Sequence, residues 1–234
     1  MYKRHISLSL ATFLLVSLGG CNQAPQSTSS TSTLPFTPTS STSAQDTATP
    51  RLEARAPLAI PGWSKFEGNQ VELQLPQTFK GGDLAKDVEV FTAELRKLGP
   101  DFEPILQTIQ RNPNAFALWA FDSEVGPSGN LTNVNIVSES VPSAITLDTY
   151  LDAAKRQFPP QFNVIEQEII QLDRYTAGRL TTEFNLNGVK GKQLAYVIKQ
   201  DTTVWVVTYS TGQDEFNQRV SRFETSIDTF YIQS

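Results

Sequence analysis

The segment TTVWVVTYSTGQDEFNQRVSRFETSIDTFY, residues 202–231, contains two different hydrophobic periods joined by a short polar corner. Its first part, 203–209, has the composition of a strand with apolar residues on both sides. Val204 and Val206 would lie on one side of this strand, and Trp205 on the other. A strand that is apolar on both faces must be covered on both faces. The segment therefore predicts a central strand with a packing layer on each side.

After the corner, apolar residues recur in steps of four and three from Phe216 onward, which is typical of one helical face. Thr211 and Asp214 have the spacing of a capping box, in which a threonine oxygen accepts a helix N–H and an acidic side chain reaches back. As a nucleophile, Ser210 would need a neighbouring base. We therefore interpret Ser210, Thr211 and Gly212 as the corner between a strand and a helix rather than as an active-site turn.

The same two periods divide the rest of the chain into strands and helices. Successive strands are separated by short turns, such as 187–191, and short turns imply antiparallel neighbours. Gly81 and Gly82 are interpreted as part of a turn. Residues 58–234 are thus predicted to form one α+β domain, in which helices flank an antiparallel sheet on both faces as an α/β/α sandwich. The predicted strands are 63–76 (a hairpin), 115–122, 131–138, 163–172, 178–186, 192–200 and 203–209, and the predicted helices are 84–98, 102–109, 146–158 and 216–230.

The N-terminus has the features of a bacterial lipoprotein signal peptide. A basic start precedes the apolar stretch 6–20, which is too short to span a membrane as a helix, since that takes about 20 residues. The sequence LGGC (18–21) resembles a lipobox. We therefore predict removal of residues 1–20 by cleavage after Gly20 and acylation of Cys21. The alternative is an ordinary signal peptide that a cysteine happens to follow.

The following segment has a composition that does not favour folding. Of the 29 residues 22–50, 15 are Ser or Thr and 4 are Pro, so there is too little apolar surface to offset the entropy of ordering the chain. We predict that 21–57 is the lipidated cysteine followed by a disordered stalk.

The net charge of the whole chain is −5 and its basic residues are scattered, which argues against a nucleic-acid partner. The acyl chains would then provide the attachment to the membrane.

Two segments carry a family resemblance. The sequence VWVVTYSTGQDEFNQRVSRFETSIDTFY (204–231) resembles the close of PsbP-like proteins, the family of extrinsic photosystem II subunits and their bacterial relatives. In that family a hydrophobic strand precedes a Tyr-[Ser/Thr] corner and a helix that ends in Ser/Thr-Phe, here Thr229-Phe230. FEGNQVELQLPQTF (66–79) resembles the family's opening hairpin, and the resemblance spans roughly residues 63–232. It implies an α/β/α sandwich and an accessory role at a membrane complex, including a photosystem, but no particular chemistry.

The residue types of the mature chain exclude several classes of chemistry. The single histidine, His5, lies in the predicted signal peptide, and the single cysteine, Cys21, is predicted to be acylated. Such a chain cannot build a Ser-His-Asp triad, a Cys-His dyad or a histidine-ligated zinc site. Met1 is the only methionine, which also excludes a methionine-ligated copper or haem site. We therefore expect no enzyme activity and no cofactor, and the sequence leaves open whether a metal binds.

Five residues remain as weak candidates for ligand contact. Asp122 and Glu124 precede a Gly- and Pro-containing loop and could offer oxygens to calcium, although the spacing is not that of an EF-hand. Glu166 and Glu168 share one strand face and could form an acid/base pair. In both cases the alternative is a solvated acidic surface. Trp63, close to the stalk, is the tryptophan most suited to a partly exposed contact.

These observations lead to two main hypotheses. The first is a non-enzymatic, membrane-anchored accessory, assembly or docking protein, monomeric in its domain, that binds an unknown membrane complex. The second is a periplasmic or lumenal module that binds a small ligand or cation. A carboxylate-based hydrolase acting through Glu166 and Glu168 is a third. The lipid anchor would place the protein on the periplasmic side of a bacterial membrane, the outer membrane by default, or in a thylakoid lumen.

Overall fold

The computed structural model describes residues 58–186 and 188–233. The predicted signal peptide, the cleavage after Gly20, the lipidation of Cys21 and the stalk over 21–57 lie outside these residues. Within the described part of the chain, no helix is both long enough and apolar enough to cross a membrane.

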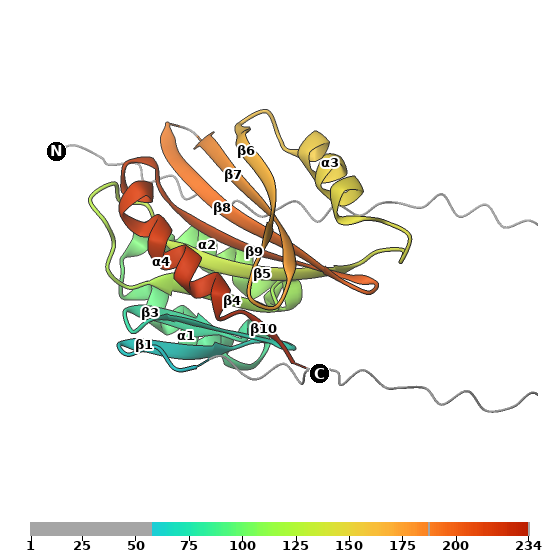
Figure 1. The fold of residues 1–234 in the computed structure, drawn as a ribbon. Coiled ribbons are helices and arrows are strands. Elements are labelled where there is room, and N and C mark those ends of the chain that lie inside the picture. The colour runs from blue at the N-terminus through green and yellow to red at the C-terminus, as the bar shows by residue number, and fades with distance from the viewer. Residues whose placement is uncertain (1–57, 187, 234) are drawn as a thin grey trace, which may run out of the picture.

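A seven-stranded antiparallel sheet forms the centre of the domain (Figure 1). Strand β9, the double-sided apolar strand of the sequence, lies in the middle of this sheet between β5 and β8. The structure therefore confirms the predicted α+β class and the antiparallel sheet. In spatial order the strands are β3 (Phe79–Gly82), β4 (Leu118–Asp122), β5 (Asn133–Ser140), β9 (Thr203–Gly212), β8 (Val189–Gln200), β7 (Thr176–Leu186) and β6 (Phe162–Gln171).

A second, smaller sheet and four α-helices complete the described domain. The small sheet is antiparallel, and its middle strand pairs on one side with its hairpin partner and on the other with the C-terminal strand. In order, these strands are β1 (Trp63–Glu67), β2 (Val71–Pro76) and β10 (Tyr231–Ile232). The α-helices are α1 (Leu84–Arg96), α2 (Glu103–Arg111), α3 (Leu147–Gln157) and α4 (Phe216–Asp228), and the single 3-10 turns are η1 (Pro100–Phe102), η2 (Pro113–Ala115) and η3 (Gln213–Glu215).

One face of the large sheet is covered by α4 together with the small sheet. The ring of Tyr209 on β9 stacks on Phe223 of α4 with 5.0 Å between the ring centroids. Its hydroxyl donates to Ser226 Oγ at 2.9 Å, and that hydroxyl donates to the backbone carbonyl of Gln74 on β2 at 2.7 Å. A short chain of contacts thus joins the large sheet, α4 and the small sheet.

The opposite face is covered by two separate groups of helices. Helices α1 and α2 pack over β4, where Phe91 lies edge-on to Trp119 and Phe121 with centroid distances of 4.8 Å and 5.4 Å. Helix α3 packs over β7 and β8, where Leu151 fills the space above Gly178. A Cβ atom on Gly178 would lie 2.5 Å from a Leu151 methyl group, so a larger residue here would force the Leu151 side chain to shift. Helices therefore flank the sheet on both faces, as predicted.

The corner at residues 210–212 differs from the prediction. Strand β9 continues through Gly212, and α4 begins only at Phe216, after the turn η3. The prediction of a capping box is wrong, because no side-chain hydrogen bond caps η3 or α4. The Thr211 hydroxyl instead lies 2.8 Å from that of Thr132. Cross-strand pairing continues to Gly212, opposite Gly191, and this removes Thr211 from the helix terminus.

Two short strands were missed. Gly81 and Gly82, interpreted as a turn, belong to β3, where Gly81 pairs with Ala120. Both glycines have positive φ angles, and a Cβ on Gly81 would lie 2.2 Å from the carbonyl oxygen of Trp119. This strand thus needs glycine for a close backbone approach, the opposite of ordinary strand propensity. Strand β10 consists of only two residues and has no period to read.

Candidate functional site

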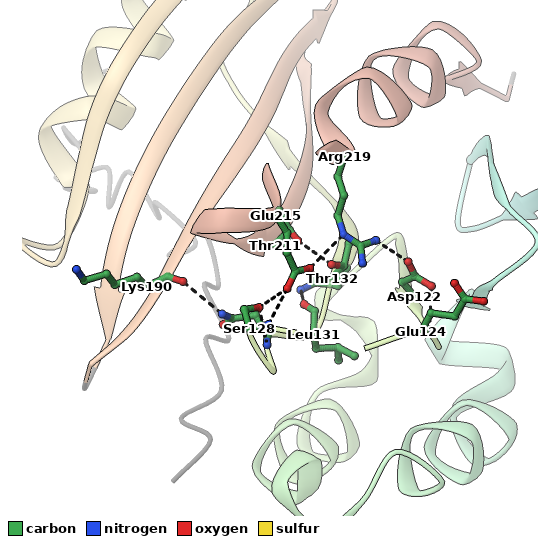
Figure 2. Close-up of polar contacts among 11 residues, drawn as sticks. Asp122, Glu124, Ser128, Leu131, Thr132, Lys190, Thr211, Glu215 and Arg219 are labelled. Carbon is green, nitrogen blue, oxygen red and sulfur yellow. Dashed lines mark hydrogen bonds and ion pairs between the residues drawn. The ribbon is translucent and has the colours of Figure 1, made fainter. Parts of the chain in front are cut away.

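A buried ionic cluster lies at one end of the large sheet (Figure 2). Asp122 comes from the last position of β4, Glu215 from η3 and Arg219 from the first turn of α4. Arg219 donates through Nη1 to Asp122 Oδ2 at 2.7 Å and through Nε to Glu215 Oε2 at 3.3 Å. The side chains of Asp122 and Glu215 are only 4% and 5% exposed, and that of Arg219 is 16% exposed. One guanidinium therefore serves two buried carboxylates.

The same cluster holds the loop between β4 and β5. The second oxygen of Glu215, Oε1, accepts hydrogen bonds from the backbone N–H of Ser128, at 3.0 Å, and from its hydroxyl. Gly126 lies so close that a Cβ atom would stand 2.1 Å from Glu215 Oε2. Further along, Asn130 donates through Nδ2 to the carbonyl of Lys190 at 3.3 Å. The loop is thus fixed to both η3 and β8.

The structure places the first two candidate residues in different environments. Asp122 is a buried member of the cluster, whereas Glu124 is exposed and its side chain is directed away from Arg219 (Figure 2). Only the backbone N–H of Glu124 takes part, donating to Asp122 Oδ1 at 3.1 Å. Among the described residues, no group of three or more Asp, Glu, His or Cys side chains is arranged to hold a metal ion.

The geometry of the buried cluster suits a structural role rather than catalysis. Both carboxylates are occupied on both oxygens, by Arg219 on one side and by backbone or hydroxyl donors of the loop on the other. Sequence analysis missed the role of Glu215, although its spacing of four residues from Arg219 is typical of a helical ion pair. The position of Asp122 beside them depends on a contact between distant segments, which no local pattern indicates.

The other two candidate carboxylates lie together on a second arginine. Arg179 on β7 donates through Nη1 to Glu166 at 3.0 Å and to Glu168 at 2.9 Å, and through Nη2 to Glu224 of α4 at 3.2 Å. Unlike the first cluster, all three carboxylates are about half exposed. The structure therefore brings Glu166 and Glu168 together on one face, with a guanidinium between them.

Below this second cluster lies a buried phenol. Tyr196 on β8 is opposite Arg179 in the β7–β8 pairing and interacts with it through its hydroxyl. Burial raises the pKa of Tyr196 to about 12, and the interaction with Arg179 opposes part of that increase. The phenol is thus neutral and protonated at neutral pH.

Trp63 lies in the small sheet, away from both clusters. It is half-buried at the start of β1, opposite Pro76 of β2, and its backbone N–H donates to the carbonyl of Ile60 at 3.1 Å. A cleft of about 520 Å³ opens nearby between β3 and α1, but Trp63 does not line it. The cleft combines aromatic and charged side chains, among them Phe66, Phe79, Phe91, Lys80, Asp87 and Glu94.

Comparison with known proteins gives likeness of fold only. No family model and no curated protein matches the chain. A solution structure of cyanobacterial PsbP (CyanoP) from Synechocystis sp. PCC 6803 is similar, at 16% identity and a TM-score of 0.45, over 77% of this chain and 98% of that one. LpqN of Mycobacterium tuberculosis, described as involved in cell envelope biogenesis, has 12% identity and a TM-score of 0.45, over 74% and 91% of the two chains. The first of these is a PsbP protein, the family that the sequence resembles.

Replacement of Arg219 tests the first cluster. Arg219→Met would leave Asp122 and Glu215 buried without a counter-ion, and we expect it to lower the free energy of unfolding by about 3–5 kcal/mol. Arg222→Met, at an exposed position of the same helix, is the control and should change it by less than about 0.5 kcal/mol. Urea unfolding measures both. Equal, small losses in the two variants would show that the cluster does not stabilise the fold.

The pKa of Tyr196 predicts how stability depends on pH. Since its folded value is about 12 and the unfolded value about 10, its contribution is complete below pH 10 and is lost as the pH rises toward 12. We expect the free energy of unfolding to fall over that interval, and less steeply in Tyr196→Phe. Denaturant unfolding across this pH range measures the slope, and the absorbance difference between the two proteins gives the pKa. An identical slope in both would contradict the assignment.

Proposed function

We propose that this protein is a membrane-anchored, non-enzymatic docking protein that binds a membrane complex through the loop Ser123–Asn130 and the adjoining end of the sheet. The observation that carries the proposal is the buried cluster that fixes this surface loop. The lipobox cysteine Cys21 would hold the protein at the membrane, with its domain on the periplasmic or lumenal side.

Buried charges are a costly means of joining a helix to a sheet. Well-packed apolar side chains would hold α4 on β4 and β5 at least as strongly, because two carboxylates and a guanidinium lose most of their hydration here. The charged side chains also fix the backbone of the loop. Glu215 accepts from the backbone N–H of Ser128, and Asp122 accepts from that of Glu124. The cluster therefore determines the shape of the loop as well as its attachment.

A loop with a fixed shape is suited to binding. Glu124 and Val125 are exposed at its surface, while the backbone N–H of Glu124 donates to Asp122. A surface that is ordered before association loses less conformational entropy on binding than a mobile one. The charged and apolar side chains together would form a small contact area for a partner protein. The proposal thus relies on preorganisation rather than on any catalytic group.

Crosslinking in native membranes tests this function. A tagged protein should yield one reproducible partner, which is lost with Cys21→Ser because the domain is no longer held at the membrane. The loop variant Val125→Arg should also reduce the yield several-fold, whereas Glu89→Lys, on the exposed surface of α1, should not. A lipidated protein that gives no partner, or a partner retained equally by the loop variant, would contradict docking through this loop.

The cleft between β3 and α1 supports a second candidate function, the binding of a small ligand. Helix α1 departs from helical geometry at Asp87, which lies on the rim, and three phenylalanines line the interior. A ligand with an apolar body and a cationic group would match the aromatic lining and the carboxylates of Asp87 and Glu94. In this case the protein would be a binding module rather than a docking protein.

A thermal-shift panel of metabolites and metal ions distinguishes the two functions. A ligand that binds the native state raises the unfolding midpoint in proportion to ln(1 + [L]/Kd). Val90→Arg places a charged side chain at the exposed rim of the cleft, so it should abolish the shift while leaving the midpoint without ligand nearly unchanged. A shift that survives Val90→Arg would show that the ligand binds elsewhere, and the absence of any shift would count against this function.

A further inference from the structure

Strand β6 is an open edge of the large sheet. It is the last strand in the order, and no other strand of the described residues pairs with its outer side. It runs for ten residues, Phe162–Gln171, whereas the strand at the opposite edge, β3, has only four. In an edge strand every second residue directs its backbone N–H and C=O away from the sheet. β6 therefore offers a row of backbone groups to a further strand.

The two faces of this edge differ in chemistry. Ile169 lies opposite Gly178, on the face that α3 covers, and is 46% exposed. Glu168 lies opposite Arg179, on the face that α4 covers. A strand added at this edge would therefore have an apolar neighbour on one face and acidic neighbours on the other, because successive residues of a strand alternate between faces. Ile165, 45% exposed, adds apolar surface at the bulge between Val164 and Glu166.

The acidic face carries more negative charge than its arginine neutralises. Glu166, Glu168 and Glu224 share the single guanidinium of Arg179, so the group has a net charge of two negative units. Farther along α4, burial together with the charges of Asp173 and Glu224 raises the pKa of Asp228. Opposite charges across neighbouring strands stabilise pairing and like charges oppose it. A basic strand is favoured on this face.

The same charges argue against a second copy of the chain as the occupant. A two-fold pairing of two β6 strands is antiparallel. If it is centred on Gln167, each Glu166 faces Glu168 of the other copy, and like charges directly opposite each other are destabilising. The bulge at Ile165 further disturbs the regular edge that self-pairing needs. Charge complementarity therefore selects a partner of different sequence.

We propose that the β6 edge binds an extended segment of a partner protein in which basic and apolar residues alternate, and that this segment adds to the sheet as an eighth strand. Its basic side chains face Glu166 and Glu168, and its apolar side chains lie beside Ile169. Backbone hydrogen bonds supply attachment, and the two faces supply specificity. The inference rests on the proposed docking function, since it names a second contact surface and the chemistry of the partner that it fits.

A designed peptide tests this inference on the detergent-solubilised full chain. The probe is acetyl-Lys-Val-Lys-Val-Lys-Val-amide, and the control is acetyl-Glu-Val-Glu-Val-Glu-Val-amide, which has the same pattern with opposite charge. We expect the lysine peptide to bind and to slow amide hydrogen exchange within 163–171. The glutamate peptide should bind at least about tenfold more weakly, since each favourable charge pair becomes a repulsive one. Equal binding of the two peptides would overturn the proposal.

Two variants separate strand addition from simple charge attraction. Glu168→Lys should weaken the lysine peptide about tenfold and improve the glutamate peptide, whereas Glu89→Lys makes the same change of charge on α1 and should alter neither. Ile169→Lys keeps both glutamates but places a charge on the apolar face, so it should also weaken the lysine peptide. Binding of this peptide without slower exchange in 163–171 would show that only side chains are involved, and would overturn strand addition.

Failure of this inference differs from failure of the docking function. If a crosslinked membrane partner is retained by both Glu168→Lys and Ile169→Lys, docking stands and the β6 edge is not its site. If no partner is found in membranes but the peptide binds with slower exchange in 163–171, the edge is a binding site and the accessory function is wrong. Loss of the crosslinked partner in both variants, with retention in Glu89→Lys, supports the two together.

Discussion

The burial of β9 on both faces is the constraint on which the rest of the structure depends. Every residue from Val204 to Gly212 is buried, so apolar layers must be present above and below the sheet. Helix α4 and the small sheet provide one layer through Tyr209, and the two helix groups provide the other. Since only the turn η3 separates β9 from α4, the same thirty residues place the central strand and one of its covers. The clusters around Arg219 and Arg179 both lie where α4 meets the large sheet.

The sequence predicts what depends on local period and not what depends on distant contact. The helix after Phe216 and the strands β6 to β9 follow from spacing alone, because side chains on one face recur at 3.6 or at 2 residues. The capping role of Thr211 was wrong because cross-strand pairing continues past it, and β3 was missed because its glycines have low strand propensity. In the candidate site, Asp122 could be selected as a candidate, but its pairing with Arg219, 97 positions later, has no local signal.

Two arginines organise the polar chemistry of the domain in different ways. Arg219 and Arg179 each serve more than one carboxylate, but Arg219 is surrounded by buried partners and Arg179 by half-exposed ones. The first arrangement fixes the shape of a loop, since each charge would be costly to leave alone. The second leaves net negative charge accessible at a sheet edge, where solvent screens it. Similar side chains thus fix a loop in one place and leave an accessible negative surface in another.

The small sheet determines where the chain leaves the domain in both directions. The first described residues lie against β2, where Gln74 accepts from the N–H of Ile60 and donates to the carbonyl of Leu58, and the C-terminal strand β10 pairs with β2 as well. This sheet covers part of one face of the large sheet and also contacts β3, the edge opposite to β6 (Figure 1). A tether attached at Leu58 would therefore hold the domain at the small sheet. The β6 edge would then lie on the side of the large sheet opposite to β3. A protein fused to the C-terminus would also be attached at the small sheet, because β10 pairs with β2.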